Sequence, residues 1–224
     1  MKAMILAAGL GARMRPLTNY TPKPLLLVGS KPLIEWHIDK LAAAGIREIV
    51  INMAHLGWQL PDTLGNGERW NIQIRYSDEQ REGALETAGG IIKALPLLGT
   101  QPFLVVNGDI WCDFDYSTLT LKPNDLAQLV LVPNPAHHPE GDFALQGDRV
   151  CAQVIPPLYT FSGIGLYNPM LFANLPPGKR PLAPLLRGAM AQKRVGGQLH
   201  SGDWRDIGTP QRLHELDDEL TARA

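Results

Sequence analysis

Near its start the chain reads Leu6-Ala7-Ala8-Gly9-Leu10-Gly11-Ala12-Arg13-Met14-Arg15-Pro16-Leu17-Thr18, and this segment decides the fold prediction. The apolar run over residues 3–7 predicts a short buried strand, and the glycines after it predict a turn. Successive backbone N–H groups at such a turn can form an anion-binding nest, and Arg13 can add paired donors for a phosphate. A plain strand-to-helix turn is the alternative interpretation of this segment taken alone.

Two common nucleotide-binding motifs are excluded by the same segment. Met14 stands where the fingerprint Gly-x-Gly-x-x-Gly requires its third glycine, and no Gly-Lys-Ser/Thr follows. The segment therefore favours neither a dinucleotide-dependent oxidoreductase nor a Walker-type ATPase.

A second motif places one lysine between two prolines, in Thr21-Pro22-Lys23-Pro24-Leu25. Proline restricts its own φ and the backbone of the residue before it, so Lys23 has a rigid mount. A lysine aimed at a phosphate benefits from such a mount. A surface lysine in a proline-rich loop is the alternative.

Strands and helices alternate along the first half of the chain. The hydrophobic pattern predicts strands over 3–7, 46–52, 72–76 and 103–106, and helices over 31–44, 58–64 and 86–95, the last ending before Pro96. Such alternation implies right-handed crossovers and parallel strands covered by helices on both faces. We expect an α/β fold of the Rossmann-like, three-layer α/β/α type, with a mostly parallel mixed sheet.

The second half predicts additions to the same sheet. Strands are expected over 127–132 and 160–167, a hairpin over 143–145 and 150–154, an extended segment over 197–206, and helices over 183–192 and 209–220. No linker or internal repeat separates the halves, so we expect a single domain over 1–224.

The composition excludes several classes of protein. The chain has 224 residues, 45% of them hydrophobic, and a net charge of −1, so no basic field marks a nucleic-acid partner. Its 22 glycines and 19 prolines exclude a helical bundle. No apolar run is long enough to span a membrane, and two isolated cysteines are typical of a reducing compartment. We expect a cytoplasmic protein without a nucleic-acid or membrane partner, either a monomer or a small homo-oligomer.

Together the motifs resemble the signature of the sugar-phosphate nucleotidyltransferase family. The resemblance covers the segment over 6–18, the lysine motif, Lys31-Pro32-Leu33-Ile34-Glu35, Asn107-Gly108-Asp109 and Trp204-Arg205-Asp206-Ile207-Gly208-Thr209-Pro210, in that order. It implies a nucleotidyltransferase fold in which 1–115 mainly bind the nucleotide and 116–224 mainly bind the sugar phosphate. Several segments are most similar to members that use UTP in bacterial cell-wall recycling. Transfer to another sugar 1-phosphate, such as mannose 1-phosphate with GTP, is the alternative.

The resemblance also implies roles for individual residues. Backbone amides of Gly9, Leu10, Gly11 and Ala12 would line the triphosphate, Arg13 and Lys23 would be catalytic and hold the phosphates, and Glu86 and Gly89 would contact the nucleotide. Asp109 and Asp206 would bind Mg²⁺, and Asn107, Asp142, Tyr159 and Ser162 would contact the sugar phosphate. The implied partners are small molecules, UTP and a sugar 1-phosphate.

Simpler interpretations remain for several of these residues. Asp109 could cap a helix, and Asp206 could be a turn residue before a glycine. Asp113 and Asp115 could form the metal motif of a glycosyltransferase, although a helix cap is the preferred interpretation of Asp115. A catalytically silent homologue would be expected to lack one of the four charged motif residues, and all four are present.

Overall fold

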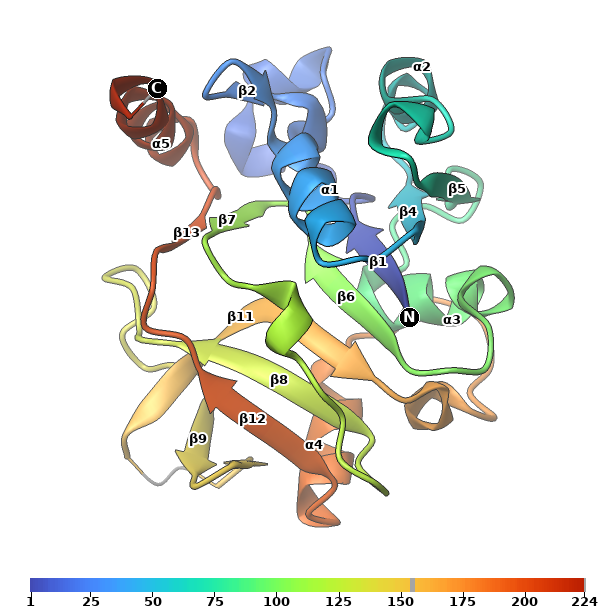
Figure 1. The fold of residues 1–224 in the computed structure, drawn as a ribbon, viewed down its shortest axis with the longest axis vertical. Helices are drawn as coiled ribbons and strands as arrows, with labels where there is room; N and C mark the ends of the chain where they lie inside the picture. Colours follow the sequence, from blue (N-terminus) through green and yellow to red (C-terminus); the bar gives the residue numbers. More distant parts are fainter. Residues whose placement is uncertain (154–155, 224) are drawn as a thin grey trace.

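One mixed sheet of nine strands forms the centre of the molecule (Figure 1). The computed structural model describes residues 1–153 and 156–223. The strand order is β5-β4-β1-β6-β11-β8-β12-β10-β9. Its strands are β1 (Lys2–Leu6), β4 (Glu48–Met53), β5 (Gln73–Asp78), β6 (Phe103–Asn107), β8 (Ala127–Val132), β9 (Phe143–Gln146), β10 (Arg149–Cys151), β11 (Leu158–Tyr167) and β12 (Val195–Leu199).

Strand direction decides where the functional loops meet. The strands β5, β4, β1 and β6 are parallel neighbours, whereas β11 runs antiparallel to β6. The carboxyl ends of β1 and β6 therefore lie at one edge of the sheet, and the loops after these strands are brought together there. The sheet is mixed beyond β6, where β12 is parallel to β8 and β11 is antiparallel to it.

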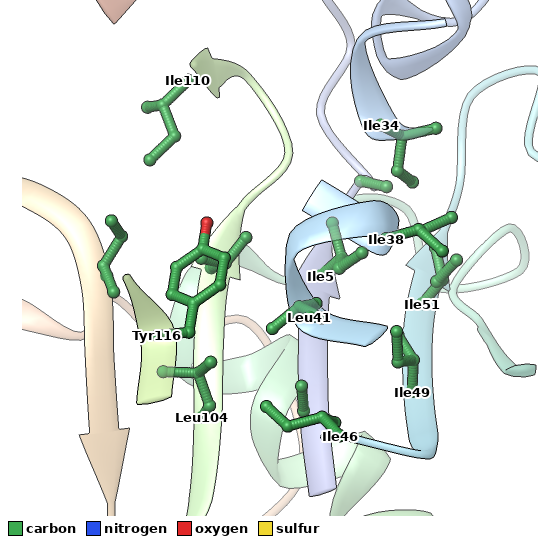
Figure 2. Packing of buried hydrophobic residues seen from close by; sticks show 14 of the residues in the cluster. Ile5, Ile34, Ile38, Leu41, Ile46, Ile49, Ile51, Leu104, Ile110 and Tyr116 are labelled. Carbon is green, nitrogen blue, oxygen red and sulfur yellow. The ribbon is translucent and has the colours of Figure 1, made fainter. Parts of the chain in front are cut away.

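Helices cover both faces of the sheet, as the sequence predicts. The helices are α1 (Leu33–Ala43), α2 (Gln59–Leu64), α3 (Glu86–Leu98), α4 (Ala183–Ala191) and α5 (Pro210–Ala222). Ile5 of β1 packs in the core on the α1 and α2 face, and its neighbour Met4 packs in the core on the α3 and α4 face. Figure 2 shows Ile38 and Leu41 of α1 beside Ile5 in the first of these cores. The three-layer α/β/α prediction is confirmed.

A third apolar cluster joins the two ends of the chain. Leu213, Leu216 and Leu220 of α5 pack with Val28 of the two-stranded ribbon β2 (Leu27–Val28) and β3 (Lys31–Pro32). A second small ribbon pairs β7 (Ile110–Cys112) antiparallel to β13 (Trp204–Asp206). The C-terminal segment is thereby placed beside the end of β6.

Three predicted elements differ in detail from the observed ones. The helix over 86–95 continues to Leu98 with Pro96 inside it, because the buried contacts of this last turn outweigh one missing backbone hydrogen bond. Lys31 and Pro32 form β3 rather than the first turn of a helix, since a tight turn at Gly29 folds them back on β2. The extended segment over 197–206 is divided between β12 and β13.

The second half adds strands to one sheet, as predicted. The expected hairpin forms between β9 and β10, and residue 154 of that prediction lies outside the described residues. The start of β11 also pairs with β9, so the far end of the sheet curls around. Among the described residues, no helix is both long and apolar enough to cross a membrane.

Candidate active site

A cavity of about 480 Å³ opens at the carboxyl edge of β1 and β6. Its wall combines the glycine-rich segment after β1, the loop that follows β6 and the start of α3. Nine of the residues singled out from the sequence line it, namely Gly9, Leu10, Gly11, Ala12, Arg13, Lys23, Glu86, Asn107 and Asp109. Residues from four distant parts of the chain therefore meet in one place.

The glycine loop (residues 7–14) has a backbone shape that its sequence requires. Gly11 has a φ of +60°, and a Cβ at this position would lie 2.8 Å from Cγ2 of Thr18. Its carbonyl accepts hydrogen bonds from the backbone N–H of Met14 and from the hydroxyl of Thr18, each at 2.8 Å. Glycine is needed at position 11 because of this positive φ and because a Cβ would collide with Thr18. The loop can therefore pass closely along the cavity wall.

Lys23 reaches the same cavity from the proline-flanked turn. The residue is 8% exposed, and its ammonium donates a hydrogen bond to Oδ2 of Asp109 at 2.9 Å. The carboxylate of Asp109 is about two-fifths exposed, so one of its oxygens is held while the group faces the cavity. The proline-flanked turn therefore places a largely buried cation in the wall of the cavity.

The small ribbon of β7 and β13 brings Asp206 next to Asp109. Asp206 is paired in register with Ile110, and the backbone N–H of Ile207 donates to the carbonyl of Asp109 at 2.9 Å. Oδ2 of Asp206 accepts a hydrogen bond from Arg212 at 2.5 Å. Asp206 itself does not line the cavity, although Gly208, two residues later, does.

A second cavity of about 380 Å³ adjoins the first. The two share Glu86, Thr87 and Asn107 as lining residues. Asp142 lines the second cavity, and its Oδ2 accepts a hydrogen bond from the backbone N–H of Phe161 at 2.8 Å. The remaining wall is mostly apolar, which gives a compartment with few polar groups for orienting a ligand.

Besides Asp206, three residues expected in the site line neither cavity. Gly89 lies inside α3, where a Cβ would come within 2.4 Å of the carbonyl oxygen of Gly178. The hydroxyl of Ser162 donates to the carbonyl of Val130 at 2.7 Å and accepts from Ile164 at 3.1 Å. Tyr159 contributes its carbonyl oxygen, which accepts a hydrogen bond from the backbone of Asp142. In this structure Gly89, Ser162 and Tyr159 contact neighbouring parts of the chain rather than a cavity.

Comparison with known proteins identifies the family. The family model described as nucleotidyl transferase matches residues 2–143, well over half of the chain. This chain belongs to the nucleotidyl transferase family.

Two relatives of this chain have the same name. The N-acetylmuramate alpha-1-phosphate uridylyltransferase of Neisseria meningitidis is 54% identical, and the alignment covers 96% of each chain. The protein of the same name from Caulobacter vibrioides is 35% identical, over 93% of this chain and 92% of the relative. A mannose-1-phosphate guanyltransferase from Aspergillus oryzae is 29% identical, and the matched part is 62% of that longer protein.

A solved structure supports the nucleotidyl transferase fold. A putative glucose-1-phosphate thymidylyltransferase from Bacillus anthracis superimposes with a TM-score of 0.84, covering 99% of this chain and 95% of that one. The two sequences are 24% identical, so this likeness bears on the fold alone.

The donor set of this nucleotidyl transferase fits a magnesium ion that also binds substrate. Within residues 1–153 and 156–223, no group of three or more His, Cys, Asp or Glu side chains is arranged to hold a metal ion. Asp109, in the turn between β6 and β7, and Asp206, in β13, would supply two hard oxygen ligands, and one oxygen of each is already bonded to a cation. Mg²⁺ is commonly bound by one or two carboxylates together with phosphate oxygens and water, which matches such a pair.

Sequence reasoning missed two polar residues in the wall of the nucleotidyl transferase cavity. Asn52 lies in β4 and Glu79 directly after β5, and both are buried and line the cavity. Neither belongs to a recognisable motif, and each falls in a segment read only as strand or turn. The signal that could have found Asn52 was a polar side chain directly after the apolar run over 49–51, toward the carboxyl end of the strand.

The remaining candidate metal residues have other partners in the nucleotidyl transferase structure. Asp115 accepts a hydrogen bond from the backbone N–H of Ser117 at 2.9 Å and caps a short 3₁₀ helix, as its preferred interpretation predicts. Asp113 pairs with His200 at 2.8 Å. His137 lies 3.3 Å from Oδ2 of Asp206, so the loop that carries it reaches the edge of the site.

Proposed function

We propose that this chain transfers the uridylyl group of UTP to N-acetylmuramate α-1-phosphate, giving UDP-N-acetylmuramate and pyrophosphate. The observation that carries the proposal is the pair of adjoining cavities that share Glu86, Thr87 and Asn107. One compartment carries the phosphate-binding features, and the other offers a mostly apolar wall with Asp142 and the shared Glu86 as its carboxylates. The choice of substrates is supported by two relatives that are named for this activity and align over nearly the whole chain.

The chemistry requires no general base from the protein. An oxygen of the sugar phosphate attacks the α-phosphorus of UTP in line, the bond from the α-phosphorus to the bridging oxygen breaks, and pyrophosphate leaves. A phosphate monoester has a second pKa of about 6, so the nucleophile is already largely ionised at pH 7. Catalysis is then a matter of positioning and of neutralising charge on the phosphates.

The chain supplies the positioning groups from three segments. Backbone amides over 9–12 lie along the cavity and would hold the triphosphate, as anions are held at glycine-rich turns. Arg13 and Lys23 would contact the phosphates, and Lys23 is fixed for this role by its bond to Asp109. Asp109 and Asp206 would hold Mg²⁺, which when bound neutralises phosphate charge and orients the triphosphate.

The second compartment would take the sugar phosphate. Asn107 lies at the junction and would orient the attacking phosphate. Asp142 would accept hydrogen bonds from sugar hydroxyls, because its carboxylate is already positioned by the backbone of Phe161. Tyr159 and Ser162 would act indirectly, by shaping the strand that carries this wall. Gly89 would keep α3 close to the segment before α4.

The cellular role follows from the substrates. We place the reaction in the cytoplasm, in the recycling of cell-wall sugars, because N-acetylmuramate is a component of peptidoglycan and UTP is a cytoplasmic nucleotide. The partners in this proposal are the two small-molecule substrates.

Pyrophosphate release from UTP and N-acetylmuramate α-1-phosphate with Mg²⁺ tests the site assignment. Asp109→Asn is expected to abolish turnover, because it removes the anionic ligand beside Lys23. Lys23→Ala is expected to lower kcat by about 10²-fold or more, as is typical when a group that stabilises transition-state charge is removed.

Asp113→Asn is the matched control. Asp113 lies four residues from Asp109 and is more exposed, and it pairs with His200 outside the cavity. This variant is expected to keep near-normal turnover. Near-normal release by both site variants, or loss of turnover in the control alone, would overturn the assignment.

A further inference from the structure

A buried polar pair joins the two loops that line the nucleotide cavity. Asn52 is 3% exposed and Glu79 is 1% exposed, and both side chains form part of the cavity wall. They come from neighbouring parallel strands, since Asn52 lies in β4 and Glu79 follows the end of β5. The mechanism above uses neither residue.

Three hydrogen bonds run in series through this pair. The backbone N–H of Ala7, at the start of the glycine loop, donates to Oδ1 of Asn52 at 2.8 Å. Nδ2 of Asn52 donates to Oε1 of Glu79 at 2.7 Å, and the backbone N–H of Leu85 donates to Oε2 of Glu79 at 3.0 Å. Leu85 immediately precedes Glu86, where the two cavities meet.

Helix α3 packs closely against the pair at Gly90. A Cβ on Gly90 of α3 would lie 2.7 Å from Oε1 of Glu79 and 2.9 Å from Nδ2 of Asn52. A glycine in the middle of this helix therefore lets α3 pack directly against the pair. Burying a carboxylate is costly unless its oxygens are hydrogen-bonded, and here both oxygens accept from buried donors.

We propose that Asn52 and Glu79 are positioning residues for nucleotidyl transfer. They fix the distance between the glycine loop, which holds the triphosphate, and the turn at Glu86, which faces both substrates. The inference rests on the proposed function for the identity of the substrates. The pair acts through the backbone of Ala7 and Leu85 and does not touch the reacting atoms.

Single substitutions are expected to break the series in opposite ways. In Glu79→Gln, the new side-chain NH2 group faces another donor, either Nδ2 of Asn52 or the backbone N–H of Leu85. In Asn52→Asp, the new carboxylate faces the carboxylate of Glu79, and no donor lies between them. Each variant is expected to lower kcat/KM by about 10- to 100-fold, the effect of leaving a buried donor or acceptor unpaired, and to weaken UTP binding measured by calorimetry without the sugar.

The decisive variant exchanges the two functional groups, as N52D/E79Q. In the double variant, Nε2 of the new glutamine can donate to the new aspartate, and its Oε1 can accept from Leu85. The other oxygen of the aspartate can accept from Ala7. All three hydrogen bonds and the net charge are thus restored, with the carboxylate moved from position 79 to position 52.

The account predicts that the double variant recovers kcat/KM and UTP affinity to within about fivefold of the wild type, by the logic of a double-mutant cycle. A double variant no better than the single variants would overturn the inference, because activity would then require the carboxylate at position 79 itself. If a single variant fails to fold, the double variant and the wild type still decide the question.

The assay keeps this inference separate from the proposed substrates. The wild type is first tested with four nucleoside triphosphates against several sugar 1-phosphates, and the variants are then compared on whichever pair it turns over. Turnover of a different pair contradicts the substrate assignment alone. Failure of the double variant on the wild type's own pair contradicts the positioning role alone.

Discussion

Glu86 has a left-handed backbone conformation, with a φ of +60°, at the junction of the two cavities. A residue with a Cβ in this conformation costs about 1–2 kcal/mol, so glycine is the usual occupant. The carboxylate of Glu86 lies 3.5 Å from the ammonium of Lys179 and is about two-fifths exposed. Because Glu86 keeps this strain where it faces both cavities, we predict that it contacts substrate.

Glu86→Gly is expected to separate stability from activity. The free energy of unfolding should be unchanged or rise by about 1 kcal/mol, because glycine adopts this φ without strain. The value of kcat/KM should fall by about 10-fold as a contact to substrate hydroxyls is lost. Denaturant unfolding and steady-state kinetics measure the two effects.

Lys193→Gly provides the control at the residue scale. Lys193 also has a positive φ, +56°, and lies after α4 in neither cavity wall. It should show a similar change in stability with unchanged kinetics. A Glu86→Gly enzyme with wild-type kcat/KM would show that the strained carboxylate has no part in catalysis.

At the scale of elements, His37 ties α1 to β7, the strand that follows Asp109. Its Nε2 donates to the carbonyl of Ile110 at 2.8 Å, and its Nδ1 forms a hydrogen bond with the hydroxyl of Tyr116 at 3.1 Å. Burial lowers the pKa of His37 to about 4. Ile110 and Tyr116 belong to the same apolar core as Ile38 and Leu41 of α1 (Figure 2).

This burial predicts a pH dependence of stability. The unfolded chain binds a proton at His37 below pH 6.5, whereas the folded chain does so only near pH 4. The contribution of neutral His37 is therefore fully present above pH 6.5 and is lost as the pH falls toward 4. Between pH 7 and pH 5 it should lower the free energy of unfolding by about 2 kcal/mol.

Urea unfolding of the wild type and of His37→Gln at the two pH values measures this contribution. The variant should lose about 2 kcal/mol less than the wild type over the interval, because it has no proton to bind at this position. Equal losses in the two proteins would contradict the account.

The local sequence predicted which strands and helices form more accurately than it predicted where each one begins and ends. The apolar runs that became β1, β6 and β8 are continuous and buried, so hydrophobic pattern alone identified them. The strand β7 was not predicted, because its three residues form a ribbon only once β13 arrives from the far end of the chain. Asn52 and Glu79 were missed for a related reason, since their pairing depends on two strands becoming neighbours in the sheet.

At the scale of the whole molecule, one sheet carries both compartments. Strand β6 from the first half pairs with β11 from the second (Figure 1). The backbone N–H of Ile207 donates to the carbonyl of Asp109. The sequence motifs predicted which charged residues lie near one another. Because Asp109 and Asp206 are far apart in the sequence, their meeting requires the end of the chain to fold back over the sheet. The order of the strands beyond β6 could not be predicted, because it depends on long-range pairing rather than on local pattern.

The central prediction is that the two adjoining cavities on this sheet are a nucleotide compartment and a sugar compartment. The most direct measurement is a matrix of pyrophosphate release, with four nucleoside triphosphates against N-acetylmuramate α-1-phosphate, mannose 1-phosphate and glucose 1-phosphate in the presence of Mg²⁺. We predict that UTP with N-acetylmuramate α-1-phosphate gives the highest kcat/KM, with UDP-N-acetylmuramate formed in equal amount to pyrophosphate. No release from this pair, with turnover of GTP and mannose 1-phosphate instead, would contradict the account.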